Sequence, residues 1–154
     1  MTERPHLSVT PPQRSGMLLR LDEPTAAFYR FLYETVGERW GWTDRSGLSD
    51  DELLEIVTDP GVIIFVLFMG GVPAGFFELD CRVEGEVELA HFGLAPEFIG
   101  RGLGKYLLAA AIDAAWDEEP DRVWVSVTDR EHPKGLLTYQ WAGFEPYETI
   151  RTRE

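Results

Sequence analysis

The sequence predicts a single domain of mixed α/β class, and three observations lead to this prediction. The chain has 154 residues, about the length of one domain, of which 44% are apolar and 27% are charged, as in globular proteins. Segments with apolar residues three and four apart, typical of helices, lie between short apolar runs bounded by glycine or proline, typical of strands. A chain of this length buries roughly 70% of its unfolded surface, so we expect a substantial core.

The first third of the chain predicts a tail, one strand and two helices. Residues 1–15 contain three prolines and no periodicity, which indicates a flexible N-terminal tail before a domain over residues 16–154. Pro24 suits the first turn of a helix, and apolar residues follow it at helical spacing. Ser49 and Glu52 have the spacing of a capping box, which marks the start of a second helix. The expected elements are a strand at 17–21, a helix that ends near Gly37 and a helix that ends before Pro60.

The rest of the chain predicts strands joined by tight turns, followed by alternating helices and strands. Eight consecutive apolar residues at 62–69 are typical of a strand buried on both faces. Gly70-Gly71 predicts a hairpin after this strand, and Glu84-Gly85 predicts a second turn. Apolar residues over 103–116 recur at the spacing of an amphipathic helix. The other expected elements are strands at 72–79, 87–94, 123–127 and 147–150, and a short helix at 133–141.

A glycine-rich stretch over residues 97–105 joins the predicted strand 87–94 to the helix that follows. Glycine at alternate positions allows unusual backbone dihedrals and lets a ligand approach the backbone closely. The free N–H groups at the start of the next helix, together with its dipole, favour a phosphate or pyrophosphate group. Arg101 and Lys105 add two positive charges. The stretch is therefore predicted to bind phosphate, although it fits neither the Rossmann nor the P-loop pattern.

The stretch resembles the acetyl-CoA motif of the GNAT N-acetyltransferases, Arg/Gln-x-x-Gly-x-Gly/Ala. Gly102 and Gly104 match the motif, whereas Ile99 stands where the family has Arg or Gln. Because backbone amides hold the pyrophosphate in this family, the departure at Ile99 implies weaker binding and not its loss.

A second segment, about 30 residues further along, resembles the family's Asn-x-x-Ala-x-x-x-Tyr-x-x-x-Gly-Phe pattern. Tyr139, Gly143 and Phe144 match it, whereas His132 replaces Asn and Gly135 replaces Ala. Two motifs in the family's order are far more specific than either motif alone.

The resemblance covers about residues 17–150 and implies a GNAT-like fold, with a central mixed β-sheet flanked by helices. It also implies acetyl-CoA as the co-substrate and no metal. In the family the pantetheine arm pairs with the backbone of the strand before the glycine-rich stretch. His132 stands where the family has Asn, and it either contacts the CoA arm or caps the helix. The cofactor-binding residues that the resemblance implies are Phe92, Gly93, Leu94, Ile99, Gly100, Arg101, Gly102, Leu103, Gly104, Lys105 and His132.

Direct attack of an amine on a thioester needs a base or a water path, donors to the carbonyl oxygen, and an acid for the departing thiolate. The resemblance places Glu88 where some GNAT members have a glutamate base, and burial on a strand would raise its pKa. Glu78, on the neighbouring strand, is the alternative base, and Tyr139 is the expected acid. His91 lies three residues from Glu88, so we expect its side chain on the opposite face of the strand.

The net charge, 14 − 27 = −13, argues against nucleic-acid binding and weakly favours a cationic acceptor. Trp40 and Trp42 lie where the family has a loop that covers the acceptor, so they are candidate substrate-binding residues; core packing is the alternative. The chain has no apolar run of about 18 residues, so the sequence predicts no membrane-spanning helix. The single cysteine, Cys81, and the lack of a signal-peptide pattern are compatible with a cytoplasmic protein.

The sequence thus predicts an N-acyltransferase that moves an acetyl group from acetyl-CoA to a primary amine of a small molecule or peptide. Two alternatives stay open: a non-catalytic acyl-CoA-binding or sensing module on the same fold, and a structural domain in which the glycine-rich stretch is an ordinary turn. The presence of both Glu88 and Tyr139 favours the enzyme. Dimers are common in families of this type, so a homodimer is an expected state.

Overall fold

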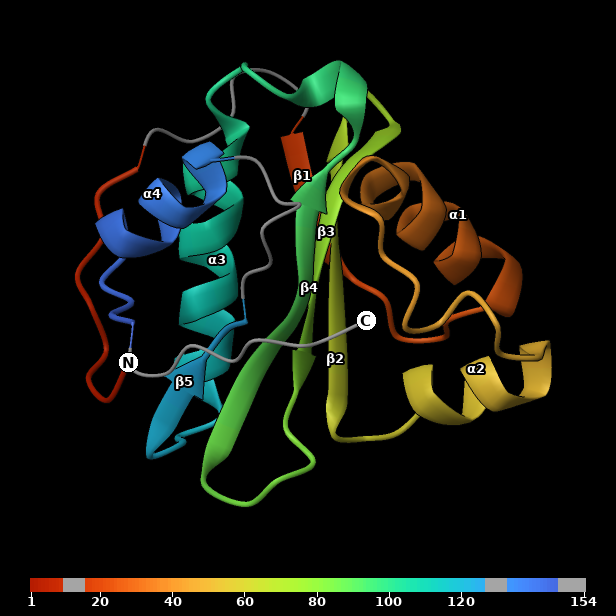
Figure 1. Cartoon of the computed structure of the whole chain (residues 1–154), viewed down its shortest axis with the longest axis horizontal. Helices are drawn as coiled ribbons and strands as arrows, with labels where there is room; N and C mark the ends of the chain where they lie inside the picture. Colours follow the sequence, from red (N-terminus) through yellow and green to blue (C-terminus); the bar gives the residue numbers. More distant parts are fainter. Residues whose placement is uncertain (10–15, 127–132, 147–154) are drawn as a thin grey trace, which may run out of the picture.

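A five-stranded sheet with the order β1-β2-β3-β4-β5 divides the molecule into two layers of helices (Figure 1). The computed structural model describes residues 1–9, 16–126 and 133–146. Strands β1 to β4 pair antiparallel, and β5 pairs parallel to β4, which makes the sheet mixed, as expected. The elements are β1 (Gly16–Arg20), α1 (Ala26–Gly37), η1 (Glu38–Trp40), α2 (Asp50–Val57), β2 (Val62–Met69), β3 (Val72–Asp80), β4 (Glu86–Leu94), η2 (Pro96–Phe98), α3 (Leu103–Asp117), β5 (Arg122–Trp124) and α4 (Pro133–Trp141).

Local capping determines where the first two helices begin. Helix α1 starts one residue after Thr25, whose hydroxyl accepts the backbone N–H of Phe28. The prediction that Pro24 lies in the first helical turn is therefore wrong, because Thr25 caps the helix after it. At α2 the predicted capping box is confirmed, since Ser49 and Glu52 bond one another's backbone N–H groups.

The β2–β3 hairpin follows the sequence prediction closely. Gly70 and Gly71 both have positive φ, +60° and +84°, which residues with a Cβ rarely adopt. Strand β2 is buried on both faces: Ile64 and Val66 pack towards α1 and α2, whereas Ile63 and Leu67 pack towards α3 and α4. Successive side chains of β2 therefore contribute to two hydrophobic cores, one on each side of the sheet.

Residues 1–9 lie against α3 and β5. The carbonyl of Met1 accepts the backbone N–H of Val123 at 2.8 Å, and Arg4 pairs with Asp113 and Asp117 on α3. The flexibility predicted for residues 1–15 stays a prediction. The strand predicted at 147–150 lies outside the described residues. Within the part of the chain that the structure describes, no helix combines the length and apolarity that crossing a membrane requires.

Candidate active site

The β4–β5 ladder is short, and this shapes one side of the candidate site. The two strands pair only from Glu86 with Arg122 to Glu88 with Trp124, whereas β4 continues to Leu94. On that side, the edge of β4 over 89–94 has no strand partner among the described residues. Its peptide groups are therefore available to an extended ligand. The predicted pantetheine-binding residues Phe92, Gly93 and Leu94 lie on this segment.

The glycine-rich stretch forms an open cradle at the C-terminal end of β4. Gly100 and Gly102 have positive φ, +84° and +78°. A Cβ added at Gly100, Gly102 or Gly104 would meet no atom within 4 Å, so the space above all three is open. Gly102 caps α3 without a side-chain hydrogen bond, which leaves the first N–H groups of the helix to a ligand. Leu103 is buried and anchors the start of α3 in the core.

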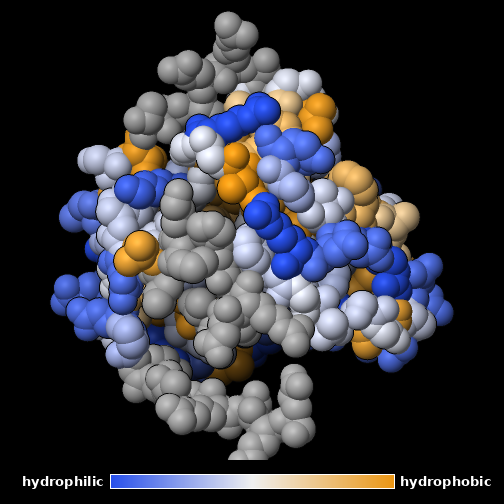
Figure 2. All heavy atoms as spheres, turned by 45° about the horizontal axis from the view of Figure 1, so that its top comes forward, coloured by the Kyte–Doolittle hydropathy of each residue, from blue (hydrophilic) through white to orange (hydrophobic). Residues whose placement is uncertain are grey.

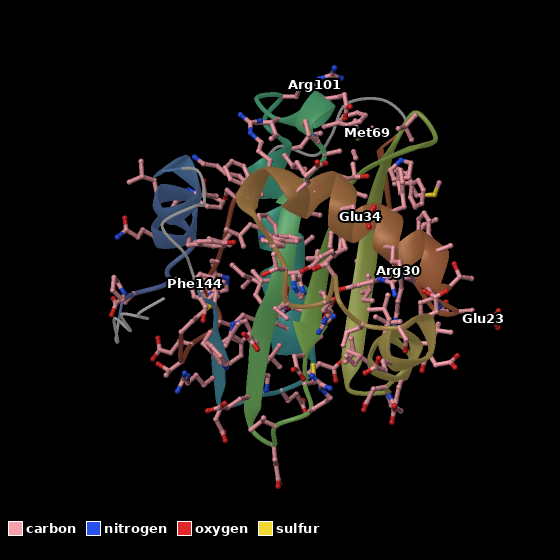
Figure 3. The ribbon with its side chains drawn as sticks, turned by 45° about the vertical axis from the view of Figure 1, so that its right-hand side comes forward. Glu23, Arg30, Glu34, Met69, Arg101 and Phe144 are labelled. Carbon is pink, nitrogen blue, oxygen red and sulfur yellow. The ribbon has the colours of Figure 1, made fainter. Side chains whose placement is uncertain are left out.

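Cations and apolar side chains border this cradle. The Arg101 guanidinium lies 5.1 Å from the ring centre of Phe98, and the Lys105 ammonium lies 4.8 Å from that of Trp141. Arg101 projects at the top end of the molecule, as Figure 3 shows. Ile99 is 40% exposed beside it. Hydrophilic side chains cover much of this face, with smaller apolar areas between them (Figure 2).

Tyr139 lies on α4 close to the free segment of β4. Its side chain is 7% exposed, and its ring centre lies 6.0 Å from that of Phe92 and 6.0 Å from that of Phe144. The structure therefore brings Tyr139, from the second motif, next to Phe92, one of the predicted pantetheine-binding residues on β4. His132 lies outside the described residues.

A β-bulge in β4 determines which side chains share its other face. Glu78 pairs with His91, and the next β3 residue, Leu79, pairs with Leu89, so β4 carries one extra residue there. The bulge reverses the alternation of side chains between Glu88 and His91. The prediction that these two residues face opposite ways is therefore wrong: both lie on the α1 side, where Glu88 is opposite Asp80.

The two predicted bases have opposite environments. Glu88 is half-buried, and desolvation, followed by the nearby charge of Asp80, raises its pKa. Glu78 is 0% exposed, and its oxygens accept hydrogen bonds from the Tyr29 hydroxyl and from Arg45, each at 2.5 Å. Desolvation opposes its ionisation, but His91, Arg45 and Tyr29 outweigh desolvation and lower its pKa. Glu78 thus has little capacity to accept a proton, whereas Glu88 is poised to do so.

Sequence reasoning missed the polar residues that surround Glu78. Asp44 and Arg45 come from the segment between η1 and α2, and Tyr29 and Tyr33 come from α1. No motif or spacing marks them, because their contacts connect residues that are 11 to 49 positions apart in the sequence.

The two predicted substrate-binding tryptophans have different surroundings. Trp42 packs on the α1 side, with its ring centre 5.0 Å from that of His91 and 5.6 Å from that of Tyr33. Trp40 is partly buried, and the Arg39 guanidinium lies 5.3 Å from its ring centre. Trp42 is partly buried, packs against the core of this face and also contacts His91 in the polar cluster around Glu78.

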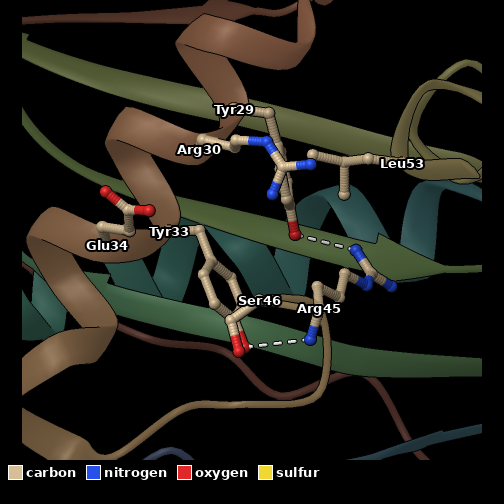
Figure 4. A pocket seen from close by; sticks show the side chains of 7 residues that line it. All are labelled: Tyr29, Arg30, Tyr33, Glu34, Arg45, Ser46 and Leu53. Atoms are coloured by element: carbon tan, nitrogen blue, oxygen red, sulfur yellow. Dashed lines mark hydrogen bonds between the residues drawn. The ribbon is translucent and has the colours of Figure 1, made fainter. Parts of the chain in front are cut away.

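A small pocket lies beside this cluster, between α1, the segment at 45–46 and α2. In Figure 4, Tyr29 and Tyr33 both point from α1 towards Arg45. The residues that line the pocket are Tyr29, Arg30, Tyr33, Glu34, Arg45, Ser46 and Leu53. Across residues 1–9, 16–126 and 133–146, no group of three or more His, Cys, Asp or Glu side chains is arranged to hold a metal ion.

The sequence model of the acetyltransferase (GNAT) family matches residues 25–144, more than half of the chain and the whole of the site described above. The chain belongs to the GNAT acetyltransferase family. No curated protein sequence matches this GNAT protein.

Solved structures of acetyltransferases have the same fold as this GNAT protein. One is an aminoglycoside acetyltransferase from an uncultured soil metagenomic sample, with a TM-score of 0.73 and 13% identity over 92% of this chain and 96% of that one. The aminoglycoside acetyltransferase AAC(6')-Iy, in complex with a CoA bisubstrate analogue, has a TM-score of 0.68 and 21% identity over 90% and 97%. The Escherichia coli ribosomal-protein-alanine N-acetyltransferase has a TM-score of 0.68 and 17% identity over 86% and 79%.

Proposed function

We propose that this GNAT protein transfers the acetyl group of acetyl-CoA to a primary amine by direct attack of the amine. The observation that carries the proposal is the open cradle at Gly100, Gly102 and Gly104, which continues into the unpaired edge of β4. A pyrophosphate fits the cradle, and an extended pantetheine arm fits the edge. The residues present therefore suit acetyl-CoA.

The cradle holds its ligand mainly through backbone groups. The N–H groups at the start of α3, near Gly102, bind the pyrophosphate, and Arg101 and Lys105 offset the negative field of a chain with net charge −13. Because the side chain at position 99 is not needed for these bonds, Ile99 is tolerated there. Backbone groups of 92–94 hold the pantetheine arm, and His132 stays a predicted contact.

The chemistry is divided between the two faces of β4. Acetyl-CoA supplies the thioester. Glu88 accepts a proton from the attacking amine, directly or through water, and its raised pKa suits this role. Tyr139, on the other face beside Phe92, donates its hydroxyl proton to the departing thiolate. Glu78, with its oxygens already bonded, is the less suitable base.

The acceptor enters from the α1 side of the sheet. Glu88, Asp80 and Asp44 make this side acidic, which favours a cationic amine, and Trp40 and Trp42 provide apolar walls. Relatives of similar fold act on aminoglycosides and on the alanine of a ribosomal protein. Both classes of amine, small molecule and peptide, are therefore candidate acceptors.

Calorimetric titration with acetyl-CoA tests the donor half of this proposal. Arg101→Ala is expected to weaken binding by about tenfold, the value of one charge-assisted contact to phosphate. Arg39→Ala is the matched control, because Arg39 is also an exposed guanidinium above an aromatic ring but lies at η1. Absence of binding by the wild-type protein at millimolar acetyl-CoA would contradict the proposal.

Turnover with a panel of aminoglycosides, polyamines and peptides tests the acceptor half. Thiolate release that requires both acetyl-CoA and an amine supports the enzyme. Binding of acetyl-CoA without turnover on any acceptor would favour the alternative, a non-catalytic acyl-CoA-binding or sensing module.

A further inference from the structure

Two consecutive residues, Asp44 and Arg45, contact a cross-strand pair on the sheet. Asp44 Oδ2 lies 3.0 Å from Nε2 of His91 on β4, and Arg45 Nη1 lies 2.5 Å from Oε2 of Glu78 on β3. Glu78 and His91 are themselves register partners, with Oε1 and Nδ1 3.3 Å apart. The four side chains alternate in sign when His91 is protonated, so each charge is next to opposite charges. We refer to Asp44, Arg45, Glu78 and His91 as the quartet.

Helix α1 binds the quartet through two tyrosines. The Tyr33 hydroxyl donates to Asp44 Oδ1 at 2.6 Å and accepts the backbone N–H of Arg45 at 3.2 Å. The Tyr29 hydroxyl donates to Glu78 and accepts from Arg45 Nη1 at 2.7 Å. Figure 4 shows both tyrosines directed at Arg45. These bonds connect α1, the segment that follows it and two strands in one network.

The quartet is buried except at Asp44. The side chains of Glu78, His91 and Arg45 are 0%, 6% and 10% exposed, whereas that of Asp44 is 59% exposed. Nδ1 of His91 is buried and has no aligned hydrogen-bond partner. Its contact with Glu78 is therefore mainly electrostatic and depends on the charge of the imidazole. The Trp42 ring lies against the same imidazole.

We propose that the quartet is a proton-dependent clamp, in which His91 as imidazolium holds segment 38–48 against the sheet and so keeps the acceptor side of the site in shape. The inference rests on the proposed function, because segment 38–48 carries Trp40 and Trp42 and lies on the same side of the sheet as Glu88. His91 is a positioning residue in this scheme: it acts on the acceptor through the segment that it holds.

Loss of the proton weakens the clamp in a defined way. A neutral imidazole keeps at most the Nε2–H bond to Asp44, and its electrostatic attraction to both carboxylates falls. The ionisable groups around His91 are Asp44, Arg45, Glu78, Glu88 and Tyr33. Desolvation lowers the pKa of His91, but Asp44 and Glu78 outweigh desolvation and raise this pKa to about 9. The clamp is therefore closed at neutral pH and opens as the pH rises through about 9.

The test compares Asp44→Asn with Asp50→Asn, a control that removes another exposed, paired aspartate from a position without contact to His91. NMR titration of the His91 imidazole, assigned with His91→Gln, gives its pKa without substrate. In Asp44→Asn the pKa is expected to fall by about one unit or more, because one charge-assisted bond is lost. In Asp50→Asn it is expected to stay near that of the wild type.

Amide exchange and kinetics then test whether the proton controls the segment. We expect amides of 41–48 to exchange faster above the pKa of His91, and this onset to move to lower pH in Asp44→Asn. The KM for the acceptor is expected to rise about tenfold across the same pH range, at unchanged acetyl-CoA affinity.

The clamp would be overturned if His91 titrated near its ordinary pKa of about 6.5. It would also be overturned if the amide-exchange rates of residues 41–48 did not change with the protonation of His91. These readouts need no turnover. The clamp can therefore fail while acetyl-CoA binding and transfer persist, and the proposed function can fail while the clamp stands.

Discussion

Replacing Gly104 with glutamate is expected to stabilise the free protein and to prevent it from binding acetyl-CoA. Gly104 is the second residue of α3, its φ lies outside the left-handed region, and the space beyond it is open. A Cβ added there meets no atom within 4 Å. Helix α3 has no acidic residue in its first turn, so the substitution also supplies a favourable charge.

The magnitudes follow from the position. Replacing glycine inside a helix contributes about 0.5–1 kcal/mol, and a carboxylate in the first turn contributes about 0.3–1 kcal/mol. The sum of roughly 1–2 kcal/mol raises the melting temperature by about 2–6 °C in a chain of this size. The same carboxylate repels a pyrophosphate by at least about 1 kcal/mol at a few ångströms and also fills its space, so affinity falls by about tenfold or more.

Thermal unfolding without ligand and calorimetric titration with acetyl-CoA measure the two effects. Gly104→Gln is the matched control, since it adds the same length and helix propensity without the charge; the difference between the two variants isolates the electrostatic part. Wild-type affinity in Gly104→Glu would refute the assignment of the cradle to phosphate. A lower melting temperature would refute the described start of α3.

Four further predictions concern the acceptor side of the sheet. Glu88→Gln should lower kcat by roughly 10²–10⁴-fold at unchanged acetyl-CoA affinity, as steady-state kinetics and calorimetry would measure; retained kcat would exclude Glu88 as the base. Because activity needs Glu88 ionised, the rate should rise with pH through its raised pKa, and Asp80→Asn should move this rise to lower pH; an unmoved profile would contradict the coupling. The pKa of His91 is raised on folding from 6.5 to about 9, so its contribution to stability, up to about 3 kcal/mol, is complete below about pH 6.5 and is lost as the pH rises through about 9. The denaturant midpoint of unfolding should fall with rising pH across this range in the wild type and fall less in His91→Gln. Equal dependence of the midpoint on pH in the two proteins would count against the contribution of His91. Arg45→Met removes one of the two cations beside buried Glu78, the other being the imidazolium of His91, and should cost up to about 3–5 kcal/mol in chemical denaturation, part of which Glu78→Gln restores in the double variant. A loss of stability as small as that of a surface substitution would disprove the role of this pair.

Most of the elements that carry the site could be predicted because local chemistry determines them. Gly70-Gly71 specifies a turn by its dihedrals, Ser49 and Glu52 specify a helix start, and the apolar run at 62–69 specifies a strand buried on both faces. Each signal needs only neighbouring residues. The open backbone of the glycine-rich stretch could be predicted for the same reason, since it is one continuous segment.

The polar network around Glu78 and His91 could not be predicted because it is assembled from distant segments. The face of His91 depends on a bulge opposite Glu78, which no pattern in the strand itself reveals. The partner of Glu78, Arg45, lies 33 residues earlier in a segment without periodicity. Which cation pairs with Glu78 therefore depends on how α1 and the segment after it pack on the sheet, which is a property of the tertiary structure.

The absence of a side chain at Gly93 has a consequence for engineering this protein. A Cβ at that position would lie 2.5 Å from Cγ1 of Val36, so the lack of a side chain at Gly93 lets α1 approach β4 closely at this point. The same strand carries the edge that we propose for the donor, and the same helix supplies Tyr29 and Tyr33 to the proposed acceptor side. The proposed donor and acceptor sites thus both depend on the contact between α1 and β4 at Val36 and Gly93. Libraries that vary α1 to change acceptor choice will also change donor affinity, unless residues 36 and 93 are varied together.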